Sequence, residues 1–364
     1  MSAIKQYIDL FNECKGAINS KSAAILNRLR ESAYALLAGD GVTLPKKGDE
    51  NYEITDIDAM FAPDYGVNIN RIDMNSAPID SFRCDVPNMD ASLYFLYNDT
   101  FMVSKRSDSN LPNGVILTSL NQAATDYPEL VGKYYGKIAD MSSGEVALNT
   151  LLVQDGLFLY IPDGVVMERP IQLINILNST SPLLANRRVL VVVGERAEAK
   201  MLICDHTQNS GVDYLSSQVF EIFVGEGATF DLYDIEEGSD TTNRVCSIYA
   251  EQSKSSNLLI NGITLTNGVT RNNINVKISG EYAECKLQGM SISSKNQHID
   301  NCTYISHDVP NTRSSELFKY VLDDNSKGAF VGRVYVAKGA IKTEAYQSNK
   351  NLCVSNDAKI HTKI

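Results

Sequence analysis

The chain has 364 residues, 43% of them hydrophobic, which is enough to bury a core in one large domain or in two of ordinary size. Its formal net charge is −11 at pH 7. Nucleic acids and anionic membranes are negative themselves, so the composition argues against both as partners.

The sequence also indicates the cellular compartment of the protein. Its first residues, MSAIKQYIDLFNECKG, contain no apolar core of signal-peptide length, and the densest apolar run, residues 189–193, is too short to span a bilayer. Seven cysteines are scattered without a C-x-x-C pair. This usage favours reduced thiols over a disulfide framework, so we expect a cytoplasmic protein.

The sequence of residues 1–143 predicts a domain of helices and mixed secondary structure. Within 20–41, apolar residues recur at spacings of three and four, which places them on one helix face. After residue 66 the pattern becomes mixed, with short strands and turns. A further helix is predicted over about 119–138, weakened by Pro128.

Residues 144–364 predict a β domain. Helical periodicity is almost absent there, and short β-rich runs are separated by Gly, Asn, Asp and Ser. The runs include LFLYIP, IQLINIL, RRVLVVV, YLSSQVFEIFV, NLLINGITL, NNINVKI and AFVGRVYV.

A repeat within this part indicates the architecture. The pattern G-E-x-A-x-x-x-[Leu/Met] occurs at 144–151, 194–201, 225–232 and 280–287. Its fourth, sixth and eighth positions share parity and therefore point inward from one strand. Spacings of 31 and 55 residues suit a solenoid with coils of variable length. We expect a right-handed parallel β-helix, and an antiparallel sandwich stays open as the alternative.

The run QHIDNCTYISH (297–307) raises the question of a metal site. His298 and Cys302 share a strand face but are four residues apart, roughly 13 Å, which is too far for one zinc ion with ligand bonds of ~2.0–2.3 Å. His307 has the opposite parity. A site shared between coils or subunits stays open, but we expect hydrogen-bonded structural or interface roles.

Cys204 and His206 form the other compact pair. Two residues apart on one strand face, they are separated by roughly 6.6 Å, which is within reach of a common metal ion. Two ligands make an incomplete site, and the sequence shows no third one nearby. We therefore expect this chain to hold no metal or cofactor stably.

Signatures of catalysis are missing as well. The chain has no G-x-x-x-x-G-K-[ST], G-x-S-x-G or H-E-x-x-H motif. The acidic pairs at 236–237 and 323–324 adjoin turn residues, so solvated turns explain them better than catalytic carboxylates. We expect a protein that is not an enzyme.

At this point a resemblance to a known family becomes visible. The segments QHIDNCTYISHDVPNTRSSELFK (297–319), SKGAFVGRVYV (326–336) and TEAYQSNKNLCVS (343–355) resemble the SufB/SufD family of iron–sulfur cluster assembly proteins. LPKKGDENYEITDIDAMF (44–61) is similar to the SufD type, with Tyr52 where a tryptophan is usual.

The resemblance implies a non-catalytic scaffold subunit that pairs with SufB through its β-helix and binds the SufC ATPase through C-terminal helices. A nascent iron–sulfur cluster would be held transiently by the full complex. The family pattern continues beyond His361-Thr362-Lys363-Ile364 with the SufC-binding helices, so the sequence resembles a SufD without that segment, and its binding of SufC is in doubt.

Association and two rival functions complete the expectations. Without SufB, we expect the chain to form a homodimer through its terminal strands, with the N–H of Val354 available for pairing. The rivals are a β-helix carbohydrate-active enzyme, such as a polysaccharide lyase, and a purely structural solenoid. The lack of tryptophan for sugar stacking counts mildly against the first.

Overall fold

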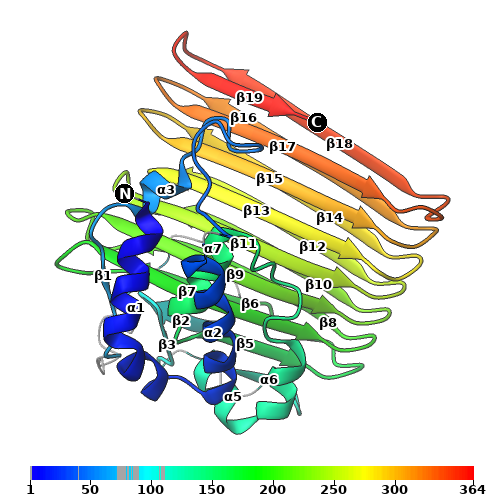
Figure 1. The fold of residues 1–364 in the computed structure, drawn as a ribbon. Helices are drawn as coiled ribbons and strands as arrows, with labels where there is room; N and C mark the ends of the chain where they lie inside the picture. The colour runs from blue at the N-terminus through cyan, green and yellow to red at the C-terminus, as the bar shows by residue number, and fades with distance from the viewer. Residues whose placement is uncertain are drawn as a thin grey trace.

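The computed structural model describes residues 2–39, 41–71, 79, 82, 84, 90–105, 107 and 111–364 (Figure 1). Its helices are α1 (Ala3–Ser20), α2 (Ala24–Ala38), α3 (Ile57–Phe61), α5 (Leu120–Asp126), α6 (Pro128–Tyr134) and α7 (Gly144–Leu152). Its first strands are β1 (Gly66–Val67), β2 (Ser92–Tyr97), β3 (Thr100–Met102) and β4 (Ile116–Ser119). None of the helices described is long and apolar enough to cross a membrane.

The rest of the chain is a stack of strands. They are β5 (Gly156–Ile161), β6 (Ile171–Leu177), β7 (Leu183–Val193), β8 (Glu198–Thr207), β9 (Tyr214–Val224), β10 (Thr229–Glu237), β11 (Thr242–Gln252), β12 (Asn257–Thr266), β13 (Val269–Ile278), β14 (Glu284–Ser293), β15 (His298–His307), β16 (Arg313–Leu322), β17 (Lys327–Val336), β18 (Glu344–Cys353) and β19 (Lys359–Lys363). In Figure 1 they rise from β5, near the helices, to β18 and β19 at the far end.

Successive strands of the stack belong in turn to one and then the other of two sheets. The odd-numbered strands from β5 to β19, with β4 and β1, form sheet A, and the even-numbered strands from β6 to β18, with β2 and β3, form sheet B. Neighbours from β5 onward are parallel, and paired residues lie from 26 positions apart (Arg244 and Thr270) to 32 apart (Lys327 and Lys359). This arrangement confirms the parallel β-helix and excludes the antiparallel sandwich.

The helical predictions are confirmed with one change and one correction. Residues 24–38 form α2, whereas the segment 119–138 is divided at Pro128 into α5 and α6. The first copy of the repeat, 144–151, was expected to be a strand and is helix α7. This helix is buried on every side between the other helices and sheet A, including its polar side chains Glu145, Asn149 and Thr150, so it has no exposed polar face and no amphipathic period.

The other three copies of the repeat mark the interior of the solenoid. Ala197, Ala228 and Ala283 are each 0% exposed at the entrance to β8, β10 and β14. The 31 residues between the copies at 194 and 225 correspond to one coil. The 55 residues between the copies at 225 and 280 correspond to two coils, and in the coil between them the buried Ser256, just before β12, takes the place of the alanine. A small residue is needed there because the turn folds back over the interior and leaves little volume beneath it.

One end of the interior is charged instead of apolar. Arg244 lies 3.3 Å from Asp205, contacts Asp234 and Glu236, and is itself buried. Glu236 was expected in a solvated turn, but it points inward from β10, and burial raises its pKa to about 7. A buried carboxylate of this kind needs a partner, and the arginine of β11 supplies it.

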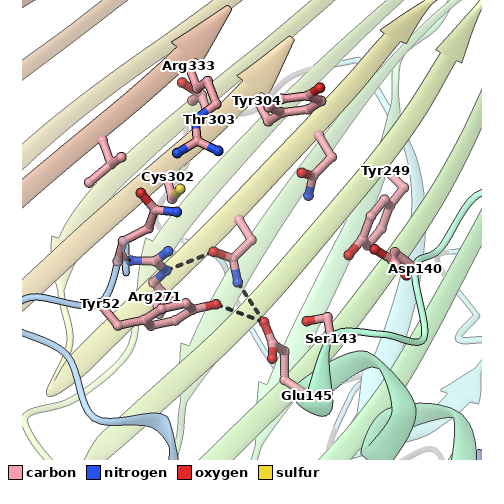
Figure 2. A pocket seen from close by; sticks show the side chains of 14 residues that line it. Tyr52, Asp140, Ser143, Glu145, Tyr249, Arg271, Cys302, Thr303, Tyr304 and Arg333 are labelled. Carbon is pink, nitrogen blue, oxygen red and sulfur yellow. Dashed lines mark hydrogen bonds between the residues drawn. The ribbon is translucent and has the colours of Figure 1, made fainter. Parts of the chain in front are cut away.

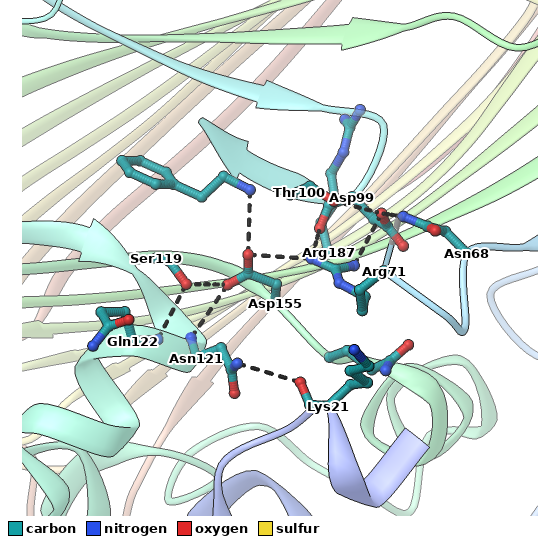
Figure 3. A network of polar contacts seen from close by, with 12 residues as sticks. Lys21, Asn68, Arg71, Asp99, Thr100, Ser119, Asn121, Gln122, Asp155 and Arg187 are labelled. Atoms are coloured by element: carbon teal, nitrogen blue, oxygen red, sulfur yellow. Dashed lines mark hydrogen bonds and ion pairs between the residues drawn. The ribbon is translucent and has the colours of Figure 1, made fainter. Parts of the chain in front are cut away.

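Asp155 joins the first coil to the preceding region (Figure 3). Its carboxylate accepts hydrogen bonds from the Ser119 hydroxyl (2.6 Å) and the Asn121 N–H (3.2 Å), and Arg71 lies 3.2 Å away. Arg71 also pairs with Asp99 at 3.0 Å. Four separate segments therefore meet at one buried acidic side chain just before β5.

The interior position of Ala283 can be tested directly. Ala283→Glu places an unpaired carboxylate in the apolar interior, so the free energy of unfolding should fall by several kcal/mol. Thermal unfolding followed by circular dichroism measures the loss. Lys286→Glu, on the exposed side of the same strand, is the matched control and should melt close to wild type. Similar melting of the two variants would contradict the assignment.

Candidate functional site

The outer face of sheet A carries charges that the N-terminal region covers. The guanidinium of Arg188 donates to Glu221 at 2.7 Å, and their side chains are 1% and 0% exposed. Glu221 also accepts from the backbone N–H groups of Gly136 and Ile138. The ring of Tyr135 lies over Arg188 at 5.1 Å. Because protein groups replace water around both charges, this pair can be buried.

A second covered pair includes the expected site residue His298. Arg271 donates to Asp300 at 2.7 Å, and the Thr55 hydroxyl donates to the same carboxylate oxygen at 2.5 Å. Thr55 Oγ1 also lies 3.0 Å from His298 Nε2. The hydroxyl proton is already used on Asp300, so His298 donates its Nε2–H to Thr55. Burial lowers the pKa of His298 to about 4, which keeps the ring neutral.

Beside this chain of hydrogen bonds lies a groove of about 250 Å³ (Figure 2). The Tyr52 ring stacks over the Arg271 guanidinium at 4.0 Å, and its hydroxyl donates to Glu145 at 3.1 Å. Asn273 donates to the same carboxylate oxygen at 3.0 Å. The residues that line the groove are Asn51, Tyr52, Asp140, Ser143, Glu145, Tyr249, Arg271, Asn273, Asn275, Cys302, Thr303, Tyr304, Val331 and Arg333.

Cys302 is the nucleophilic group of this groove. Burial raises the pKa of its thiol, although Arg271 acts in the opposite direction. None of the described lining residues is a histidine, so the thiol lacks the imidazole partner that activates cysteine nucleophiles. The groove presents hydrogen-bonding groups beside a thiol whose pKa is raised by burial.

His307 lies on the opposite face of β15, inside the solenoid. Its Nδ1 is 2.7 Å from Thr312 Oγ1, and its Nε2 is 2.9 Å from Ser314 Oγ. Both ring nitrogens are thus occupied by hydroxyl groups within the next turn and strand. The structure therefore distributes the histidines and the cysteine of 297–307 over three environments and does not gather them at one site.

Cys204 and His206 come together with a residue that the sequence did not indicate. Both point outward from β8, and Cys84 covers them there, with its Sγ 3.2 Å from His206 Nε2. One ligand atom from each of the three lies within 4.8 Å of the others. Among the residues that the structure describes, this is the one such group of three or more His, Cys, Asp or Glu side chains.

Sequence reasoning could not have found Cys84. It is 122 positions from His206, and it follows no repeat or strand pattern. Thr55 and Glu145 lie in the segments 44–61 and 144–151 that the sequence singled out, but their contacts with sheet A were missed because each reaches it from a distant part of the chain. Tyr52 was singled out within the family-like segment 44–61, which also contains Thr55, because a tryptophan is usual at its position.

Two protein-family profiles match this chain. The profile of the SufBD protein N-terminal region matches residues 1–173. The profile described as "SUF system FeS cluster assembly, SufBD core domain" matches residues 175–363.

Individual relatives are distant and longer. An iron–sulfur cluster assembly SufBD family protein of Synechocystis is 24% identical over 95% of this chain and 77% of its own length. The iron–sulfur cluster assembly protein SufD of Bacillus subtilis is 26% identical over 76% of this chain and 63% of its own length. The SufB protein of the same organism is 25% identical over 65% of this chain and half of its own length.

The buried state of His298 predicts a dependence of stability on pH. An unfolded histidine titrates near 6.5, whereas folded His298 stays neutral down to about pH 4. Its contribution to stability is therefore complete above pH 6.5 and is lost as the pH falls through the folded value. Urea unfolding between about pH 7 and pH 4.5 should show a smaller loss in His298→Gln than in wild type.

A core variant without a titrating group provides the control. Ile305→Val, on the inward face of the same strand, should lower stability by about 0.5–1.5 kcal/mol equally at each pH. If His298→Gln also lowers the free energy of unfolding by the same amount at every pH, then the loss of wild-type stability toward pH 4.5 does not come from His298.

Proposed function

Because the chain belongs to the SufB/SufD family, we propose that it is a non-catalytic scaffold subunit of an iron–sulfur cluster assembly complex, acting with a SufB-like subunit and a SufC-like ATPase. The observation that carries the proposal is the match of both family profiles, which together span residues 1–173 and 175–363. The relatives named SufD and SufBD family protein support a SufD-like role within it.

The geometry of the chain supports a scaffold more than an enzyme. The acidic pair at 236–237 is divided between the inside and the outside of β10, so the two carboxylates cannot face one substrate. At 323–324, Asp324 accepts the backbone N–H of Lys295 in a turn. The groove of Figure 2 offers binding groups without an activated nucleophile. These three observations count against the carbohydrate-active alternative.

The surface proposed for the SufB-like partner is the last coil of the solenoid. Strands β18 and β19 stand at the ends of the two sheet orders. Large exposed apolar side chains gather around them: Tyr335, Val336, Ile341, Tyr346, Leu352 and Val354. Exposed apolar patches and strand edges are both features through which chains associate. In the absence of a partner, the same surface would support a homodimer.

The role expected for Val354 in this contact is wrong. Its N–H donates to the Leu322 carbonyl at 2.7 Å, inside the ladder of sheet B. Leu352 is the better probe, because its side chain is 58% exposed on the last strand. It lies in register with Val321, and Val321 lies in register with Ile292 two coils earlier.

In this proposal, the iron–sulfur cluster is the cargo of the whole complex, held transiently, and is not a resident group of this chain. None of the seven cysteines forms a disulfide, which fits assembly in a reducing compartment such as the cytoplasm.

The proposal predicts a complex that can be isolated. Untagged chain, mixed with tagged SufB-like and SufC-like subunits from the same source, should co-elute with them in size-exclusion chromatography with light scattering. Leu352→Glu should weaken the association with the SufB-like subunit, because a carboxylate would be buried at the contact. Ile292→Glu, in the same column of sheet B, is the matched control and should bind as wild type does.

Two results would contradict the proposal. If the wild-type chain, folded by circular dichroism, elutes apart from both subunits at every concentration, the scaffold role is wrong. If the complex forms but Leu352→Glu and Ile292→Glu bind equally well, the partner surface lies elsewhere and the role itself stands.

A further inference from the structure

The group of Cys84, Cys204 and His206 lies apart from the groove, on the outer face of sheet B. Cys204 is fully buried, and the side chain of His206 is 10% exposed. The two project from the same face of β8, and Cys84 approaches from the segment between β1 and β2. Two soft sulfur atoms and one imidazole nitrogen therefore converge on one small volume.

The spacing of these atoms matches that of metal ligands. Ligand bonds of ~2.0–2.3 Å around a tetrahedral zinc ion place neighbouring ligand atoms roughly 3.3–3.8 Å apart. Cys84 Sγ and His206 Nε2 are 3.2 Å apart, and all three ligand atoms lie within 4.8 Å of one another. Adjustments of about 1 Å or less would allow one ion to contact all of them.

The surroundings orient the same three side chains. The Gln172 amide nitrogen lies 3.8 Å from Cys84 Sγ and 3.7 Å from Cys204 Sγ, between the two sulfurs. The second ring nitrogen of His206, Nδ1, faces the Glu237 carboxylate at 3.8 Å, and the Phe82 ring packs against the imidazole at 5.1 Å. A carboxylate behind a metal-binding histidine is a common outer partner, because it fixes the ring and makes it a stronger ligand.

We infer that Cys84, Cys204 and His206 form a binding site for a thiophilic metal ion, with Zn²⁺ as the ion of best fit. Thiolate and imidazole are the ligands that zinc prefers, whereas magnesium and calcium require oxygen ligands. Binding would release one proton from each thiol, and two thiolates with one Zn²⁺ and a neutral imidazole give a site without net charge. A neutral site is compatible with this degree of burial.

This inference is independent of the proposed scaffold function. The sequence indicated only two ligands here, which was the reason to expect no stable metal, and Cys84 supplies the third. Three protein ligands leave the fourth position of a tetrahedral zinc ion for water or for a group from outside the chain.

Zinc binding can be measured on the reduced, metal-free chain without an affinity tag. The chain, added to a chromogenic chelator loaded with Zn²⁺ under anaerobic conditions, should remove one equivalent of zinc. With Co²⁺ in place of Zn²⁺, thiolate-to-metal charge-transfer absorption should appear. Zn²⁺ should also raise the melting temperature, because it binds the folded state alone.

Variants locate the ion. Cys84→Ser and His206→Gln should abolish stoichiometric binding, and the cobalt charge-transfer band should be lost with it. Glu237→Gln keeps all three ligands and should weaken zinc binding by about 10- to 100-fold. Cys353→Ser, which removes an exposed thiol on β18, is the control and should bind one equivalent with wild-type affinity.

Either of two results would overturn the inference. A reduced wild-type chain that leaves zinc on the chelator, or a Cys84→Ser variant that binds zinc as tightly as wild type, shows that these side chains do not form the site. Because Cys204 is buried and its replacement could unfold β8, the decision rests on Cys84, His206 and Glu237, each of which is checked for folding by circular dichroism.

Discussion

The buried ion pairs on the outer face of sheet A hold the molecule together. Arg188 with Glu221 and Arg271 with Asp300 lie on strands of the solenoid, but the groups that complete their hydrogen bonds come from the N-terminal region. Taking such charges out of water costs several kcal/mol per ion unless protein groups replace the water. Neither part of the chain can therefore reach its observed state alone. The N-terminal region is an integral cover of the sheet, and the groove beside it exists because the cover crosses β13 and β15 there.

The parts of the fold that were predictable are those governed by a local rule. Alanines at the entrance to β8, β10 and β14 are inward because strand parity and turn geometry act within a few residues. The segment 144–151 fits the same pattern, yet it is a helix enclosed by distant segments. Apolar residues of α1 and α2 pack against one side of it, and its Asn149 donates a hydrogen bond to Asn186 of sheet A on another. A pattern of eight residues cannot report which neighbours will enclose it.

The same distinction divides the candidate sites. Parity correctly separated His298 and Cys302 from His307, since all three are on one strand. The partners that determine the state of His298 and His206 are Thr55 and Cys84, which lie 243 and 122 positions away. Glu236 likewise depends on Arg244 of the following strand. The sequence names the side chains that have chemistry to offer, whereas the fold decides which of them meet.

The variation in coil length has a consequence for how such a chain can evolve. Residues paired between coils are 26 to 32 positions apart, while most strands keep about ten residues, so the turns absorb the difference. An insertion or deletion in a turn leaves every pairing in both ladders unchanged, provided that the small residue at the entrance to the strand is kept. Lineages can therefore accumulate length changes at the corners and substitutions along the outer faces while the architecture persists. Relatives that share only about a quarter of the aligned residues with this chain are consistent with such drift.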